Sequence, residues 1–159
     1  MGEYYMGLAM CLLKTGETER AIEFASKATK NAKKFGLKRF ISFKILYDKA
    51  HFDYMYSEQV NTLESIFEAK RVLERHLSNE DKFMERFSGY YCRFNYLLAK
   101  LNLKLSNEEE ALRLLRKAAD FNTTYKTTAP RAYSLQLLSE IYMSSGRKVE
   151  AAEALEKLN

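Results

Sequence analysis

The chain is poor in the residues that break helices and in those that build catalytic or metal sites. It has one Pro and six Gly among 159 residues, so long stretches run without a strong breaker, which favours an all-helical protein. Its two histidines, His51 and His76, lie far apart and outside any known nucleophile or metal-ligand pattern. No Gly-rich phosphate loop is present. These absences argue against catalysis and predict neither a cofactor nor a metal site.

Cysteine is equally scarce, with Cys11 and Cys92 alone in the chain. Each lies within a helical pattern, and neither has a second Cys or a His at ligand spacing. Because free cysteines are often core residues, we predict two buried, reduced thiols rather than a disulfide or a metal ligand.

Long hydrophobic runs are also missing. The longest is a few residues, against the roughly 20 that a membrane-spanning helix needs, so none is expected. Glu3 stands where a signal peptide carries positive charge, and Met6 stands where a myristoylation signal needs Ser or Thr. We therefore expect a cytoplasmic protein without a leader or lipid anchor. Since 47% of the residues are hydrophobic and 13% aromatic, the chain should fold as one domain over residues 1–159.

What the chain has is a repeated pattern of small and apolar residues. The residues recur four and seven positions apart in three places: Ala21, Ala25 and Ala28; Ala111, Leu115 and Ala118; Ala151, Leu155 and Leu158. An upstream set precedes each of them: Tyr5, Leu8, Ala9, Leu12 and Gly16; Leu98, Ala99, Asn102 and Ser106; Leu135, Leu138, Ser139, Tyr142 and Gly146. Each unit predicts a helical hairpin. A lone hairpin cannot bury its apolar faces, so the units are expected to stack side by side into a solenoid.

Periodicity and end signals predict eight helices. Their approximate ranges are 3–14, 17–35, 38–56, 61–77, 78–105, 106–121, 129–146 and 147–159. Gly16, Gly36 and Gly146 supply turns, and Pro130 suits the first turn of the seventh helix. A polar, Thr-rich loop is expected over residues 122–128.

Two helix starts carry the pattern of a capping box, in which an Asn or Ser side chain and an acid three residues later cap each other's backbone amides. These are Asn61 with Glu64 and Ser106 with Glu109, and Ser78 with Asp81 is a weaker cap of the same kind. The fifth helix is expected to be interrupted only at Ser88 and Gly89. A non-repeating helix bundle would give similar amphipathic helices, but it would not explain why the turn glycines precede Ala21 and Ala151 at equal distances.

The hairpins resemble the tetratricopeptide repeat, a helix-turn-helix unit of 34 residues. The last hairpin matches best, through Leu135, Leu138, Ser139, Tyr142, Gly146, Ala151, Leu155 and Leu158. The second hairpin departs from the pattern and has only Ser65, Ala69 and Val72 in suitable places. The resemblance implies an all-α solenoid, a right-handed superhelix of four hairpins over about residues 3–35, 38–77, 80–121 and 129–158. In each repeat, helix A precedes the turn and helix B follows it.

The family's geometry implies a concave groove lined by the A helices. Carried over position by position, the lining is Met6, Met10 and Leu13; Arg93, Tyr96, Lys100 and Leu103; Tyr133, Gln136, Glu140 and Met143. Only Lys100 and Arg93 could imitate the basic set that holds a peptide's terminal carboxylate in some members. Met and Tyr instead suit adaptable packing against an apolar peptide or helix. Alternatively, some of these side chains bury against the neighbouring repeat.

Charge suggests a second surface. The net charge is +5, and Lys27, Lys30 and Lys34 share one helical face that could meet phosphates or an acidic partner. Such runs are more often solvated faces, no RNA or DNA motif accompanies this one, and the other half of the chain is acidic. We therefore argue against nucleic acid. The difference in charge between the two halves could equally let copies of the chain self-associate end to end.

Two functions follow from these patterns. The first is a non-catalytic scaffold that binds a protein or peptide segment, helical or extended, in its groove. The second is the sensor or oligomerisation domain of a regulator whose nucleic-acid-binding domain lies elsewhere. Because the last residues, Leu158 and Asn159, directly follow a helix B, Ala151, Leu155 and Leu158 are expected to leave an apolar edge, which suggests a fragment, a dimer or a covered end.

Overall fold

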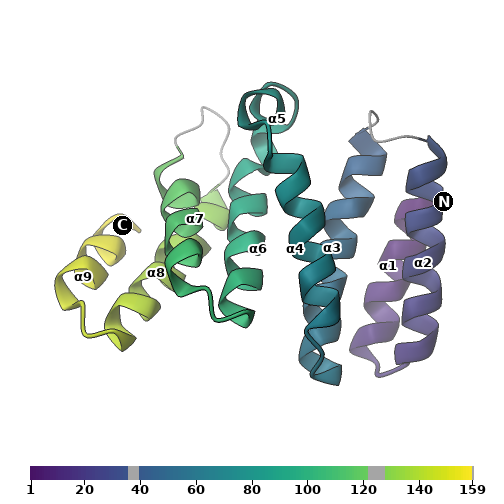
Figure 1. Ribbon diagram of the computed structural model, residues 1–159, viewed down its shortest axis with the longest axis horizontal. Helices are drawn as coiled ribbons and strands as arrows, with labels where there is room; N and C mark the ends of the chain where they lie inside the picture. The colour runs from purple at the N-terminus through teal and green to yellow at the C-terminus, as the bar shows by residue number, and fades with distance from the viewer. Residues whose placement is uncertain (36–39, 122–127, 159) are drawn as a thin grey trace. The chain divides into compact units, whose positions relative to one another are not determined.

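The computed structural model describes residues 1–35, 40–121 and 128–158, and within these ranges the secondary structure is helical with no strand. The contacts divide the chain into two compact units, Met1–Arg75 and His76–Asn159. The helices are α1 (Gly2–Lys14), α2 (Thr18–Phe35), α3 (Phe40–Val60), α4 (Glu64–Leu77), α5 (Glu80–Phe87), the 3-10 helix η1 (Ser88–Tyr90), α6 (Tyr91–Lys104), α7 (Glu108–Asp120), α8 (Thr128–Ser144) and α9 (Lys148–Glu156) (Figure 1). The predicted all-α fold of helical hairpins is confirmed; the single domain and the right-handed superhelix stay predictions.

In the first unit, α1 packs against α2, and both helices contact α3. The core contains Met6, Leu13, Ile45 and Phe52, together with the small residues Ala9, Ala21, Ala25, Ala28 and Ala32. The side-chain amide of Gln59 donates a hydrogen bond of 2.9 Å to the backbone carbonyl oxygen of Leu13 and so links the end of α3 to the end of α1. The Ser65 hydroxyl donates to the carbonyl oxygen of Asp53, which joins α4 to α3.

In the second unit, α6 packs against α7 and α8, and α8 packs against α9 (Figure 1). The long helix predicted over 78–105 is divided, because η1 intervenes at Ser88 and separates α5 from α6. Buried leucines of α6 and α7, among them Leu101 and Leu115, fill the space between the helices. Each such side chain contributes about 1.5–3 kcal/mol through its burial.

The turns inside three hairpins share one backbone arrangement. The residues Gly16, Ser106 and Gly146 have positive φ values of 83°, 59° and 74°. At each turn, the amide of the positive-φ residue bonds a carbonyl three residues back, and the next amide bonds a carbonyl five residues back. These bonds are Gly16 to Leu13 and Glu17 to Leu12; Ser106 to Leu103 and Asn107 to Asn102; Gly146 to Met143 and Arg147 to Tyr142. This pattern satisfies the last carbonyls of helix A and stops it at the same place in each hairpin.

The weaker cap predicted at Ser78 was wrong, because Asn79 caps α5 and its side chain accepts a hydrogen bond of 3.1 Å from the Lys82 backbone amide. The capping boxes predicted at Asn61 and Ser106 were both wrong for another reason. Ser106 lies one residue before the N-cap of α7, which is Asn107, and Asn61 has φ 50° and lies three residues before α4. Ser and Asn are the residue types expected at an N-cap, but a turn between antiparallel helices also needs one residue in the left-handed region. Asn adopts this region more readily than most residues do. In both places the residue forms part of the turn and does not cap the following helix.

The prediction of two buried cysteines is confirmed for one residue and wrong for the other. Cys92 is buried, and its thiol lies 3.4 Å from the carbonyl oxygen of Ala118. Cys11 is exposed, so the prediction that it is buried was wrong. It lies on α1 between residues of the buried stripe Ala9, Leu12 and Leu13 and points away from them. The predicted turn at Gly36 and the predicted loop over 122–128 fall, except for Thr128 at the start of α8, outside the described residues.

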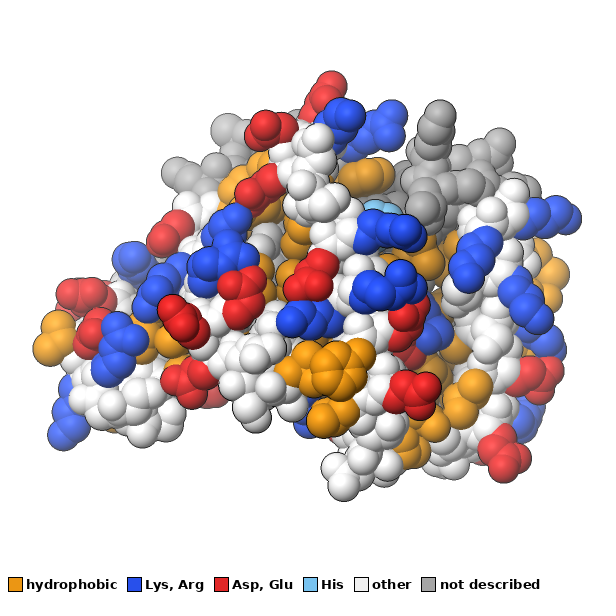
Figure 2. All heavy atoms as spheres, in the orientation of Figure 1, with side chains coloured by type: hydrophobic (Ala, Val, Ile, Leu, Met, Phe, Trp, Pro, Cys, Tyr) orange, Lys and Arg blue, Asp and Glu red, His pale blue; other side chains and the backbone are white. Residues whose placement is uncertain are grey.

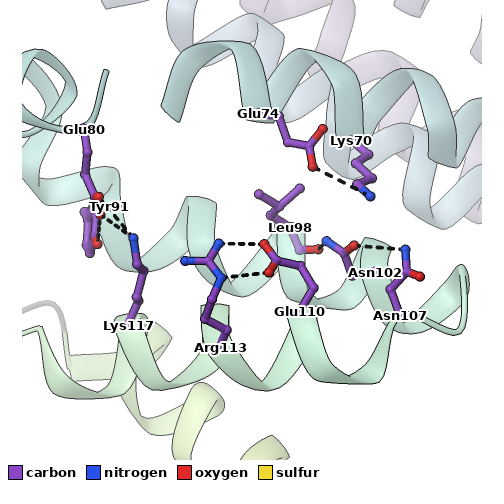
Figure 3. A network of polar contacts seen from close by, with 10 residues as sticks. All are labelled: Lys70, Glu74, Glu80, Tyr91, Leu98, Asn102, Asn107, Glu110, Arg113 and Lys117. Atoms are coloured by element: carbon purple, nitrogen blue, oxygen red, sulfur yellow. Dashed lines mark hydrogen bonds and ion pairs between the residues drawn. The ribbon is translucent and has the colours of Figure 1, made fainter. Parts of the chain in front are cut away.

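A polar network holds α5 to α6 and α7 (Figure 3). The Tyr91 hydroxyl donates to the Glu80 carboxylate, and the Lys117 ammonium donates to both Glu80 oxygens at 3.1 Å. The bond from Tyr91 and the charge of Lys117 lower the pKa of Glu80. Burial and the neighbouring carboxylate raise the pKa of Tyr91 well above its usual value, so the hydroxyl keeps its proton. The network thus connects three helices through one carboxylate.

Replacing a turn glycine should destabilise the fold through backbone strain alone. At Gly16 and Gly146 an added Cβ would meet no atom within 4 Å, so Gly16→Ala and Gly146→Ala remove no contact. We expect each to lower the free energy of unfolding by about 1 kcal/mol, because the backbone must keep a left-handed conformation. Ser106→Gly should raise it by about 0.5 kcal/mol, since strain relief exceeds the added chain entropy. Urea denaturation followed by circular dichroism measures all three.

The matched control for the turn variants is Gly7→Ala. Gly7 lies within α1, where an added Cβ also meets nothing within 4 Å and the backbone is helical. This variant should stabilise the protein by about 0.5–1 kcal/mol, the reverse of the turn variants. Equal effects of Gly7→Ala and Gly16→Ala would show that the left-handed turn carries no strain.

Removing the Tyr91 hydroxyl should give a pH-dependent loss of stability. Because the folded-state pKa of Glu80 is below its unfolded value of about 4.3, its carboxylate stabilises the fold above that pH, and the contribution disappears as the pH falls through the folded pKa. Tyr91→Phe should cost about 1 kcal/mol at pH 7, and the difference from wild type should shrink as the pH drops below 4. Urea denaturation at several pH values measures it.

Tyr4→Phe is the control for this loss, because Tyr4 is exposed. Its effect should be small and independent of pH. If the cost of Tyr91→Phe were the same at pH 3 and pH 7, the bond to a charged Glu80 would not be the source of the stability.

Candidate binding surface

One side of α6 carries the residues that the sequence assigned to a binding groove. Arg93, Tyr96, Lys100 and Leu103 are spaced by three, four and three positions, which puts them on one face of a helix. The other sides of α6 are buried and include Phe94, Leu98 and Leu101. Arg93 is exposed, and Tyr96, Lys100 and Leu103 are half-buried. The packing of α6 therefore turns these four side chains outward.

α8 repeats the arrangement with the same spacing. Tyr133, Gln136, Glu140 and Met143 are all exposed, and Tyr133 and Met143 each keep 55% of their surface. Opposite them, Leu135, Leu138 and Tyr142 are buried. The Gln136 amide donates a hydrogen bond of 3.1 Å to the Glu140 carboxylate, which fixes two of the polar groups relative to each other.

The two faces meet at a pair of tyrosines. α6 and α8 are neighbours in the second unit, and the ring centroids of Tyr96 and Tyr133 lie 6.1 Å apart at an interplanar angle of 37°. This separation is within the range of favourable aromatic pairs. We call the surface the tyrosine face. It consists of Arg93, Tyr96, Lys100 and Leu103 from α6 and Tyr133, Gln136, Glu140 and Met143 from α8.

Cations and a carboxylate surround the tyrosine pair. The Lys100 ammonium lies 5.8 Å from the centroid of the Tyr96 ring, and the Arg93 guanidinium lies 5.4 Å from the Tyr90 ring, both within cation–π range. Burial, together with the nearby Glu140 charge and Tyr133, raises the pKa of Tyr96. Its hydroxyl is therefore neutral at physiological pH and can donate a hydrogen bond. The face combines flat apolar area with donors and charges of both signs.

The groove residues predicted on α1 lie elsewhere. Met6 and Leu13 are fully buried in the core of the first unit, next to residues such as Ala9 and Ile45. This is the burial against a neighbouring helix that the sequence left open as the alternative. Met10 is half-buried and packs against the same core. The structure thus brings together the predicted residues of α6 and α8, whereas Met6 and Leu13 are buried in the core of the first unit and are not available to line a groove.

The predicted basic face lies on α2, in the first unit. Lys27, Lys30 and Lys34 are exposed. The Lys27 ammonium pairs with the Glu23 carboxylate at 2.5 Å and lies 4.8 Å from the Phe24 ring centroid, so part of its charge is balanced within the helix. This arrangement is typical of a solvated helix surface.

Sequence reasoning missed a cleft in the second unit. It has a volume of about 280 Å³ and lies among α7, α8 and α9, with Ala119, Leu135, Leu138 and Ala154 among its apolar residues. Charged residues on its walls are largely paired with one another. Arg147 bonds Glu150 at 2.9 Å, and Lys157 lies 3.5 Å from Asp120. Such a cleft depends on how three helices diverge, and no local sequence pattern signals it.

None of the His, Cys, Asp and Glu side chains in the described part of the chain gather in a group of three or more that could hold a metal ion. In the same part of the chain, no helix combines the length and the apolar character that crossing a bilayer requires. The exposed apolar edge expected on the last helix is present at Leu155 and Leu158, whereas Ala151 is buried.

Comparison with protein families supports the hairpin assignment. A model of the tetratricopeptide repeat matches residues 2–35, which are α1, its turn and α2. Neither the curated proteins nor the solved structures gave a match to the chain. α1 and α2 share their turn geometry with the α6–α7 and α8–α9 hairpins, so the features of the matched segment recur along the chain. The predicted resemblance to the tetratricopeptide repeat family is confirmed through its first hairpin.

Proposed function

We propose that the protein is a non-catalytic scaffold that binds a protein or peptide segment on the tyrosine face. The contact between Tyr96 and Tyr133 carries this proposal, because it joins two A helices into one continuous surface. Tetratricopeptide repeats generally mediate protein interactions, which supports a protein or peptide as the ligand.

The composition of the face suits a peptide better than a small polar ligand. Tyrosine rings supply broad apolar area with few rotatable bonds, so ordering them on binding costs little entropy. The exposed side chain of Met143 lies at one end of the α8 face and can repack against different partners. Arg93 and Glu140, of opposite charge and on different helices, can fix the orientation of a bound segment.

The proposal predicts that the tyrosines are the energetic centre of binding. A display library of random peptides is selected against the full chain, and the affinities of the selected peptides are then measured for variants by calorimetry. Tyr133→Glu should weaken binding at least about tenfold, because buried aromatic residues dominate most interfaces. Arg93→Ala should have a smaller effect that diminishes with added salt.

Val149→Glu is the matched control, because Val149 is an exposed apolar residue of the same unit, on α9. It should leave the affinity unchanged, and circular dichroism should show both variants folded. If the library yields no binder, or if the selected peptides bind Tyr133→Glu as tightly as wild type, the tyrosine face is not the binding surface.

A further inference from the structure

An apolar patch lies on the surface of the first unit, where α3 ends and α4 begins. Val60, Leu63 and Phe67 are exposed, and Phe67 keeps 59% of its surface. Figure 2 shows apolar side chains gathered on this surface, bordered by acidic and basic groups. A Phe that remains this open on a helix costs solvation free energy unless something covers it. None of these residues belongs to the tyrosine face.

The charges on the same side of α4 change sign along the helix. Glu64 and Glu68 come first, and Arg71 and Arg75 follow, all four exposed. Successive spacings of four, three and four positions put them on one face. The inward face of the helix is formed by Ile66, Ala69 and Leu73, which are buried. On this face α4 therefore carries its acids in the first half and its bases in the second, and Phe67 lies within the first half, between Glu64 and Glu68 in the sequence. Glu74, also exposed, lies at the edge of the face and pairs with Lys70 at 3.7 Å.

From this pattern we infer that the outer face of α4 binds the same face of a second copy of the chain, with the two helices antiparallel. A two-fold contact requires a surface that complements itself. Suppose that the two-fold axis crosses the helix pair at the level between Ala69 and Lys70. Glu68 then lies opposite the second copy's Arg71, and Glu64 lies opposite its Arg75. Both oppositions occur twice, so four pairs of opposite charge form around the centre.

Phe67 has a matching position in the same arrangement. It lies on the edge of the charged face, close in height to the second copy's Arg71. A guanidinium over an aromatic ring gains cation–π attraction, and the alkyl part of Arg71 covers apolar area. Within one chain Arg71 already bonds Glu68 through two nitrogens, at 3.0 and 2.8 Å. Its guanidinium is therefore held beside the face that the second copy meets.

A second copy fits this face better than an unrelated partner does. An acidic or a basic peptide would complement only half of α4, whereas an antiparallel copy complements both halves at once. α4 has 14 residues and is about 21 Å long, so the contact is smaller than a standard interface of about 1,600 Å². The dimer should therefore be weak and should dissociate on dilution between about 1 mM and about 1 μM.

Sedimentation equilibrium of the full chain over this concentration range tests the pairing by charge exchange. Glu68→Arg gives four basic groups at the centre, and Arg71→Glu gives four acidic ones. Each variant alone should dimerise at least about tenfold more weakly than wild type. An equimolar mixture of the two should recover association, because each copy then faces the opposite charge. The double variant Glu68→Arg/Arg71→Glu should also recover it.

Phe67→Glu tests the apolar part of the contact, with Val149→Glu as the control on α9. Both replaced side chains are exposed, so both variants should fold, which circular dichroism checks. Phe67→Glu should weaken dimerisation at least about tenfold, and Val149→Glu should not change it. None of the α4 variants should alter peptide binding at the tyrosine face, so the two proposals fail separately.

Three results would overturn the inference. The first is a wild-type chain that stays monomeric up to about 1 mM. The second is a dimer that neither Phe67→Glu nor the single charge reversals weaken. The third is a mixture of the reversed variants that remains as monomeric as each alone, which would exclude antiparallel pairing of Glu68 with Arg71.

Discussion

The constraint on which the hairpins depend is the single left-handed residue at the end of each A helix. At Gly16, Ser106 and Gly146 the chain reverses through the same two backbone hydrogen bonds, and the B helix begins two residues later in each case. A helix that ran one residue further would rotate every following side chain by about 100° and expose the next apolar stripe. Because the turn is fixed, Ala21, Ala111 and Ala151 arrive at equivalent buried positions against their A helices.

The same register determines what remains on the outside. Small residues let α6 and α7 approach closely. The helix faces that point away from such contacts are not needed for packing the core. On α6 and α8 the free faces carry Tyr96 and Tyr133, and the contact between α6 and α8 brings the rings together. On α6 the inner side is further anchored by polar groups such as Asn102, which donates to the Leu98 carbonyl and receives a bond from Asn107 (Figure 3). The proposed binding surface is thus a consequence of core packing and turn geometry acting together.

Periodicity was sufficient to predict the helices and the hairpins, because apolar spacing reports burial directly. The resemblance to the tetratricopeptide repeat, and not periodicity alone, grouped the residues of the tyrosine face, because the family's geometry assigns equivalent positions of successive A helices to one surface. Other features depend on non-local contacts. Met6 was assigned to a groove, but α3 covers it, and the second hairpin had too few matching residues to reveal this. Cys11 was assigned to the core by residue type, although it is exposed. Ser106 resembled an N-cap because propensity cannot distinguish a cap from the turn residue before it.

A and B helices also differ in the kind of interaction that their free faces allow. The free faces of α6 and α8 carry neutral rings with a mixture of charges, and such a surface can accommodate segments of varied sequence. The free face of α4 instead orders its charges along the helix, acid before base, around one exposed Phe67. This order of charges favours the antiparallel orientation of two α4 helices. It disfavours the parallel orientation, in which like charges would face each other. The two proposed interactions therefore depend on different helices and on different chemistry, apolar rings on α6 and α8 and ordered charges on α4.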